Sequence, residues 1–229
     1  MADPGAGQEA FEAAMRFHTG VLSWENAPHG TPVPHEQDQA RAVALFQQSA
    51  DAKHPDGLAG LGRMYLWGYG GLTRDEAKAL GLFQESAALD SGFGLAMLGN
   101  MYFRGIGGVE GGARDEKKAL RCFQRSAEKG HPEGFARLGE MYREGRGGVA
   151  RDDARARQLY QESAGTGWAY GQVMLGGMCR TGRGGLARNE KEAVRLTQLA
   201  ANQGHPEGIC MLGFCHAFGD FQEGDLPVD

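Results

Sequence analysis

One serine of the chain has the spacing of an enzyme nucleophile. Ser126 precedes Lys129 by three residues, and this S-x-x-K arrangement carries the nucleophile of penicillin-interacting enzymes. Neither an S-D-N nor a K-T-G motif accompanies it. Serine also recurs at the matching positions of a sequence repeat, as Ser49, Ser86 and Ser163. We therefore predict that Ser126 is part of a repeated structure and that the protein is not an enzyme.

Histidines and cysteines are candidate metal ligands, but their spacing argues against a metal centre. His54, His131 and His205 each precede a proline. Stacked repeats would hold them at least a helix-pair width apart, whereas metal ligands converge on one ion. The cysteines form no C-x-x-C pair, and we interpret them as small buried residues of a reducing compartment. They are Cys122, Cys179, Cys210 and Cys215. The sequence thus predicts turn histidines, with no metal and no cofactor.

A recurring arginine offers a possible contact with a polyanion. Stacked repeats would align these arginines into a basic ladder. The competing interpretation pairs each arginine with a nearby carboxylate, such as Asp75 or Glu110. The formal net charge is −5 and the pI is about 5.8, whereas nucleic-acid binding proteins usually carry a basic surplus. We therefore predict local ion pairs and no nucleic-acid partner. The arginines are Arg74, Arg114, Arg151 and Arg188.

These candidates belong to a sequence repeat that organises most of the chain. The pair Leu-Gly recurs at steps of 37, 40, 37 and 37 residues, and glycine also lies four residues before and seven after each leucine. The leucines are Leu61, Leu98, Leu138, Leu175 and Leu212. Units that recur at such a period bury their apolar faces only against one another, so they must stack.

Each repeat predicts two short helices. Helix A lies between the two outer glycines, for example Gly57 and Gly68, and the second glycine suits a left-handed helix cap. Helix B follows a Gly-Gly turn and a residue that can accept a hydrogen bond from the first turn. Its apolar positions, such as Ala79, Phe83 and Ala87, have helical spacing. The predicted N-caps are Asp38, Asp75, Asp115, Asp152 and Asn189.

The combined pattern A-x-L-G-x-M-Y-x-x-G, G-G-V/L-x-R-D-x-x-x-A and F/Y-x-x-S-A resembles the Sel1-like repeat family, a relative of tetratricopeptide repeats. The resemblance extends from about Gln8 to Asp229. It implies an all-α fold, a right-handed α/α superhelical solenoid of helix-turn-helix repeats whose A helices line a concave face. It also implies an adaptor role, because members mostly act as adaptors and share no general catalytic residues.

We interpret residues 1–229 as a single repeat array. The first repeat, 1–56, diverges through an inserted loop at 21–37, which is either a surface loop or an N-terminal lid. The full repeats are 57–93, 94–133, 134–170 and 171–207, and a partial repeat, 208–229, has helix A only. Because its helix B is missing, we expect either that the natural gene continues or that a partner covers the exposed apolar face.

A partner-binding groove is predicted from the A-helix positions that vary between repeats. These lie one residue before the leucine and two, five and six after it, a spacing that defines one helix face. The alternative is that this face is merely solvated, or that its aromatic side chains pack under a neighbouring element. The predicted groove residues are Arg63, Leu66, Trp67, Asn100, Phe103, Arg104, Arg137, Glu140, Arg143, Arg180, Phe214 and Phe218.

The sequence therefore predicts a scaffold or adaptor that binds a peptide or protein segment in this groove. The alternative is the repeat portion of a larger protein, which regulates an attached or partner catalytic domain. No apolar stretch approaches eighteen residues and the start has no signal region, which predicts a cytoplasmic protein without membrane insertion. Secretion or a periplasmic location stays open if a leader was removed, as does self-association through the C-terminal repeat.

Overall fold

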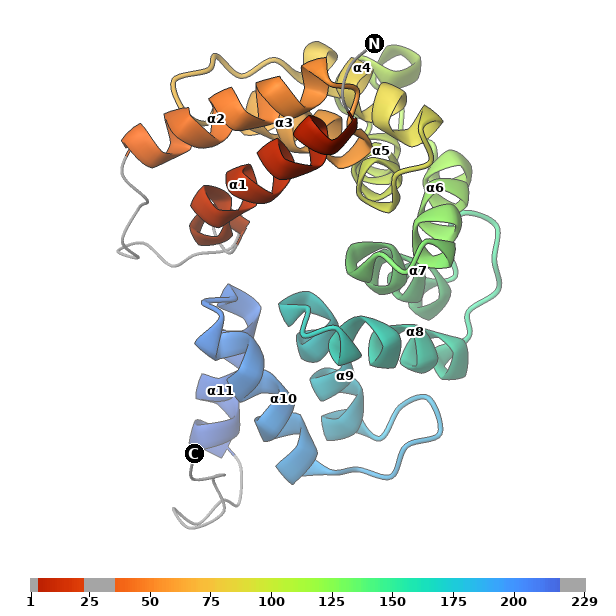
Figure 1. Cartoon of the computed structure of the whole chain (residues 1–229). Coiled ribbons are helices and arrows are strands. Elements are labelled where there is room, and N and C mark those ends of the chain that lie inside the picture. Colours follow the sequence, from red (N-terminus) through yellow and green to blue (C-terminus); the bar gives the residue numbers. More distant parts are fainter. Residues whose placement is uncertain (1–3, 23–35, 219–229) are drawn as a thin grey trace. The chain divides into compact units, whose positions relative to one another are not determined.

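The computed structural model describes residues 4–22 and 36–218, which form eleven α-helices, one 3-10 helix and no strand (Figure 1). The helices are α1 Pro4–Leu22, α2 Glu36–Asp51, α3 Pro55–Trp67, α4 Glu76–Ala88, α5 Gly92–Arg104, α6 Glu116–Glu128, α7 Pro132–Glu144, α8 Asp153–Gly165, α9 Ala169–Thr181, α10 Glu190–Asn202 and α11 Pro206–Phe218. The 3-10 helix, η2, is Val109–Gly112. The all-helical prediction is confirmed. The predicted insert at 21–37 lies outside the described residues except for its ends, which belong to α1 and α2.

The chain divides into two compact units, and each is described by itself. Unit 1 holds α1 to α6 and the start of α7 as far as Gly134, and unit 2 runs from Phe135 through α11. In unit 1, α1 pairs with α2, α3 with α4 and α5 with α6, while α2 and α4 also contact the helix that follows. In unit 2, α8 to α11 make the same consecutive contacts. We call the odd-numbered helices A helices and the even-numbered helices B helices.

The helix ends follow the predicted cap chemistry, with one exception. Asp75, for example, accepts a hydrogen bond from the Lys78 backbone N–H at 2.8 Å. The C-cap glycine of α3, Gly68, has a φ of 70°, in the left-handed region that glycine adopts without strain. Side-chain caps of the same kind begin α6, α8 and α10, at Asp115, Asp152 and Asn189. The prediction for Asp38 is wrong: α2 begins at Glu36, so Asp38 lies in the first turn, 3.8 Å from Arg41.

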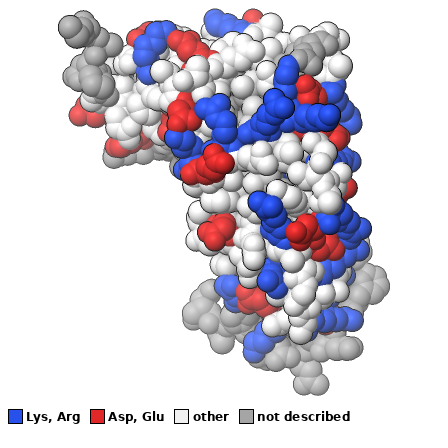
Figure 2. All heavy atoms as spheres, turned by 90° about the vertical axis from the view of Figure 1, so that its right-hand side faces the viewer, with Lys and Arg blue, Asp and Glu red and all other residues white. Residues whose placement is uncertain are grey.

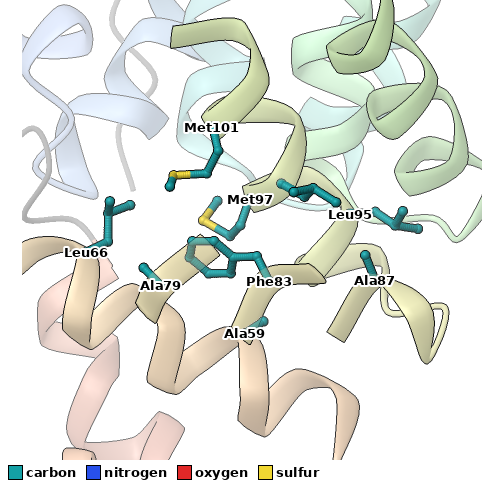
Figure 3. Packing of buried hydrophobic residues seen from close by; sticks show 9 residues of the cluster. Ala59, Leu66, Ala79, Phe83, Ala87, Leu95, Met97 and Met101 are labelled. Carbon is teal, nitrogen blue, oxygen red and sulfur yellow. The ribbon is translucent and has the colours of Figure 1, made fainter. Parts of the chain in front are cut away.

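Phe83 of α4 lies at the centre of a core cluster that joins α3, α4 and α5 (Figure 3). Its ring is fully buried, as is Ala79, which precedes it by one helical turn. A Cβ on Gly62 of α3 would come within 2.7 Å of this ring. The glycine that follows the leucine therefore makes room for a large aromatic side chain of the paired B helix, and Gly99 and Gly139 do the same for Phe123 and Tyr160.

A buried serine in each of the B helices α2, α4 and α6 bonds to the A helix before it. Ser86 of α4 donates a hydrogen bond to the Pro55 carbonyl at the start of α3, at 2.7 Å. Ser126 of α6 donates in the same way to the Gly92 carbonyl of α5, also at 2.7 Å. The opposite side of Ser86 faces Gly94 of the next A helix, where an added Cβ would overlap the serine hydroxyl and lie 2.6 Å from its Cβ. One small hydroxyl thus joins three successive helices.

Replacing Gly94 by alanine should destabilise unit 1, because the new Cβ would meet Ser86 and the Ala87 backbone nitrogen at 3.0 Å. We expect a loss of about 1–3 kcal/mol in the free energy of unfolding, as for other overpacked sites. The matched control is Gly81→Ala in α4, where an added Cβ meets nothing within 4 Å. That change should stabilise by about 0.5–1 kcal/mol through helix propensity. Urea unfolding monitored by circular dichroism measures both, and an equal effect of the two would contradict the close approach.

Ser126→Ala should cost about 0.5–1.5 kcal/mol of unfolding free energy, the usual contribution of one buried hydrogen bond. Glu128→Ala is the control on the same helix, because Glu128 is exposed, and its effect should stay within about 0.5 kcal/mol. Both values come from urea midpoints. An unchanged midpoint for Ser126→Ala would mean that the bond to Gly92 does not hold α5 and α6 together.

Candidate functional site

Two A helices of unit 2, α7 and α9, are buried except along one row of side chains. Past the first turn, α7 and α9 keep partial or full exposure only at the positions one before and two, five and six after the repeat leucine. We call these positions the stripe. The stripe residues are Arg137, Glu140, Arg143 and Glu144 in α7, and Met174, Gly177, Arg180 and Thr181 in α9. The packing positions recur between repeats, and the exposed stripe positions vary.

In α5 of unit 1 the stripe is shorter. Asn100 and Phe103 are half-buried and Arg104, in the last turn, is exposed, whereas Met97 is buried in the core. Tyr102 also keeps partial exposure, so the boundary between stripe and core is less sharp than in α7 and α9. The end of α5 thus presents an aromatic ring beside an arginine.

In α3 the predicted groove residues belong mostly to the packing. Leu66 is 6% exposed and is part of the cluster around Phe83 (Figure 3). Arg63 is 5% exposed, with its guanidinium 5.4 Å from the ring centre of Phe93 in the next A helix. Trp67 is half-buried against the same cluster, and its buried Nε1 has no hydrogen-bond partner among the described residues. This corrects the assignment of Arg63 and Leu66, because neither side chain presents a surface to a partner.

Several variable residues of unit 1 join one repeat to the next rather than face outward. The Asn100 side chain donates to the Glu133 carboxylate at 2.7 Å. The ring of Phe93 stacks on His131, with ring centres 5.6 Å apart. Burial lowers the pKa of His131, so its imidazole is neutral at neutral pH. The residues that differ between repeats therefore include contacts on which the stack depends.

Unit 2 contains the same kind of contact between successive A helices. The Arg137 guanidinium lies 4.9 Å from the ring centre of Tyr170, and Tyr170 lies 6.0 Å from the ring of His205. Arg137 also pairs with Glu140 at 3.2 Å. Burial, together with the nearby Arg137, lowers the pKa of His205. The structure thus brings Arg137 and Glu140 together as a pair within the stripe.

Sequence reasoning missed the second residue of the A helices as a contact position. It alternates between acidic and aromatic from repeat to repeat: Asp56, Phe93, Glu133, Tyr170 and Glu207. The residue before the helix alternates with it, since His-Pro precedes the acidic members only. This alternation was visible in the sequence and would have predicted that the contacts between successive A helices alternate between two kinds.

The stripe of unit 2 becomes apolar toward α11. A Cβ on Gly177 would lie 3.8 Å from the end of the Met211 side chain, so the stripes of α9 and α11 adjoin. Phe214 is 62% exposed and Ile209 is 40% exposed. Arg180 is exposed on α9 and acts electrostatically on Cys215 of α11. The side chain of Phe218, also predicted for the groove, lies outside the described residues.

The other candidates from the sequence have structural roles. Ser126 is fully buried and its hydroxyl is bonded to Gly92. The predicted local pairing of the repeated arginines is confirmed for three of them, although the partner is the carboxylate two residues later: Arg74–Glu76, Arg151–Asp153 and Arg188–Glu190.

The cysteines differ in exposure. Burial raises the pKa of the Cys122 thiol to about 11, whereas Cys210 is exposed, contrary to the prediction of four buried thiols. Within the described ranges, no group of histidine, cysteine or acidic side chains is arranged to hold a metal ion. The helices of those ranges also include none that is long and apolar enough to span a membrane.

Comparison with known proteins identifies the repeat. The Sel1 repeat family matches residues 29–54, 55–91, 93–131, 135–165, 169–205 and 206–229. No curated protein matches the sequence. Among solved structures, a Sel1 repeat protein from Oxalobacter formigenes is 18% identical with a TM-score of 0.68, covering 98% of this chain and 94% of that one.

Two further structures share the fold. A protective antigen present in uropathogenic Escherichia coli strains, displaying an SLR fold, is 28% identical over 96% of this chain, with a TM-score of 0.58. This chain covers only 44% of that antigen. An immunity protein from Pseudomonas aeruginosa is 21% identical with a TM-score of 0.56, covering 95% of this chain and 88% of its own. Since the family match extends over most of the sequence, the chain belongs to the Sel1 repeat family.

Proposed function

We propose that this protein is an interaction scaffold that binds a segment of a partner protein along the stripe of its A helices. Sel1 repeat proteins generally act in protein–protein interaction. For this chain, the observation that carries the proposal is the exposure of α7 and α9, which past the first turn is confined to the stripe. A surface that varies between repeats while the packing recurs is where a solenoid acquires a specific partner.

The chemistry of the stripe indicates what kind of segment would bind. In unit 2, the exposed ring of Phe214 lies on α11 and the exposed Arg180 lies on the adjoining α9. In unit 1, Phe103 and Arg104 offer the same combination at the end of α5. An aromatic surface beside an arginine suits a segment with an apolar anchor and an acidic group. Within unit 2, the half-buried Arg137, Glu140 and Arg143 would line the remainder.

A second candidate is the repeat portion of a larger protein that regulates a catalytic domain. What supports a longer chain is the Escherichia coli antigen with an SLR fold, of which this chain spans less than half. The mass of the native gene product, measured by intact mass spectrometry, tests this candidate. A mass equal to 24.6 kDa would oppose an attached domain.

Changing one aromatic residue and one arginine of the unit 2 stripe should abolish partner capture. We expect the Phe214→Ala/Arg180→Glu variant to lose at least about tenfold in capture of the partner, because aromatic and arginine side chains dominate binding energy at interfaces. The measurement is a pull-down from lysate of the source organism, quantified by mass spectrometry. The Phe103→Ala/Arg104→Glu variant tests unit 1 in the same way.

The control is Leu199→Ala/Arg121→Glu, which makes the same two kinds of change on exposed sites of the B helices α10 and α6. Circular dichroism establishes that all three variants are folded. Proteins captured by wild type and control but not by a stripe variant support the proposal. Equal capture by all four proteins would exclude the stripe as the binding surface.

A further inference from the structure

Four arginines surround a shallow depression in unit 2, at the ends of its A helices. The depression has a volume of about 390 Å³ and is lined by Arg143, Glu144, Arg146, Arg151 and Arg183. The first two belong to the last turn of α7, Arg146 and Arg151 to the connection from α7 to α8, and Arg183 to the connection after α9. The lining therefore carries a surplus of three positive charges, in a chain whose net charge is −5.

The repeat register shows that three of these arginines, Arg143, Arg146 and Arg183, stand where the repeats of unit 1 have apolar residues. We compare the residues five and eight positions after the repeat leucine. In the first two full repeats both are apolar or aromatic: Leu66 and Tyr69, then Phe103 and Ile106. In the next two repeats both are arginine: Arg143 and Arg146, then Arg180 and Arg183. Tyr69 and Ile106 pack against the core clusters of unit 1. The fold is satisfied by apolar side chains at these positions, so Arg143, Arg146 and Arg183 are not required by the repeat.

Acidic residues hold three of the four guanidinium groups in place. Glu144 bridges Arg143 and Arg146, with one carboxylate oxygen 2.7 Å from the first and the other 2.9 Å from the second. Asp153 binds Arg151 through two contacts of 3.2 and 3.0 Å. A ligand would therefore meet arginines whose orientation is already fixed, which lowers the entropic cost of binding.

Hydrogen-bonding capacity remains at this site. The Nε of Arg143 is buried and has no hydrogen-bond partner among the described residues, and the Arg143 guanidinium also interacts with the buried Tyr160 of α8. Arg183 forms no ion pair within the described ranges. Charge compensation at the end of α7 would explain Arg143 and Arg146. Arg151 precedes the positive end of α8, and its position is arginine in every full repeat.

We infer that this depression binds the phosphate group of a phosphorylated peptide segment. Arginine forks bind phosphate through paired, charge-assisted hydrogen bonds, and a phosphate monoester carries about −1.5 to −2 charges, against −1 for a carboxylate. The charge pattern favours one compact anion over a nucleic-acid backbone. Acidic side chains lie among the basic ones on the face shown in Figure 2, and Glu140, Glu144 and Asp153 would repel neighbouring phosphates.

The test is fluorescence anisotropy with a labelled phosphoserine peptide that has only glycine and alanine neighbours, so that it carries no apolar anchor for the stripe. The salt concentration is about 0.15 M, at which distant charges are screened. We expect the wild-type protein to bind the phosphopeptide and not its unphosphorylated form. The Arg146→Gln/Arg183→Gln variant should bind at least about tenfold more weakly, because it loses two charge-assisted contacts.

The matched control, Arg74→Gln/Arg121→Gln, removes the same charge from exposed sites of unit 1 and should change the affinity less than about twofold. Two single variants, Arg151→Gln and Arg74→Gln, change the same repeat position, which lies inside the depression in the first case and outside it in the second. Comparing their affinities for the phosphopeptide isolates the effect of the depression. Equal loss in site and control variants would overturn the inference, as would equal binding of the unphosphorylated peptide. If inorganic phosphate displaced the labelled peptide as well as unlabelled phosphopeptide does, the ligand would be free phosphate and not a phosphorylated peptide. If a single-stranded oligonucleotide bound more tightly than the phosphopeptide, the ligand would be a nucleic acid instead.

Discussion

The contact between a buried serine and two successive A helices is the constraint on which the stack depends. Ser86 donates to the Pro55 carbonyl of the helix before it, and Gly94 of the helix after it lies against its opposite side. A larger residue at either position would separate the helices. Because Ser126 repeats the bond to Gly92 and also faces a glycine, Gly134, the spacing between neighbouring repeats is set by two of the smallest side chains.

This dependence explains why the fold of each unit was predictable from sequence. Small residues recur in register at these positions, as do the cap residues, so the helix ends could be named to within a residue at Asp75 and Gly68. The first repeat was harder, because it lacks the Gly-Gly turn that precedes the other B helices. Without that turn, α2 starts two residues before Asp38, and the cap pattern alone gave the wrong boundary.

The candidate site was only partly predictable. The exposure of Arg143 and Arg180 follows from helical periodicity and the repeat register. Periodicity does not show how far a long side chain reaches, however, and Arg63 reaches the Phe93 ring of the next helix and is buried there. A position that varies between repeats can either face a partner or contact the neighbouring repeat. Only the three-dimensional contacts distinguish these two roles.

The joins between A helices alternate in kind along the chain. Phe11 stacks on His54, Ser91 bonds to Asp56, Phe93 stacks on His131 and Tyr170 lies beside His205. Each of these aromatic rings thus packs against a histidine of the following repeat, whereas the Asp56 carboxylate accepts a hydrogen bond from a serine. The unit that can be added or removed without changing these contacts is therefore a pair of repeats. Gain or loss of a single repeat would instead place two A helices in contact whose side chains do not pair in this way. Such arrays would lengthen or shorten most readily by about 74 to 77 residues at a time, the distance that separates His54, His131 and His205.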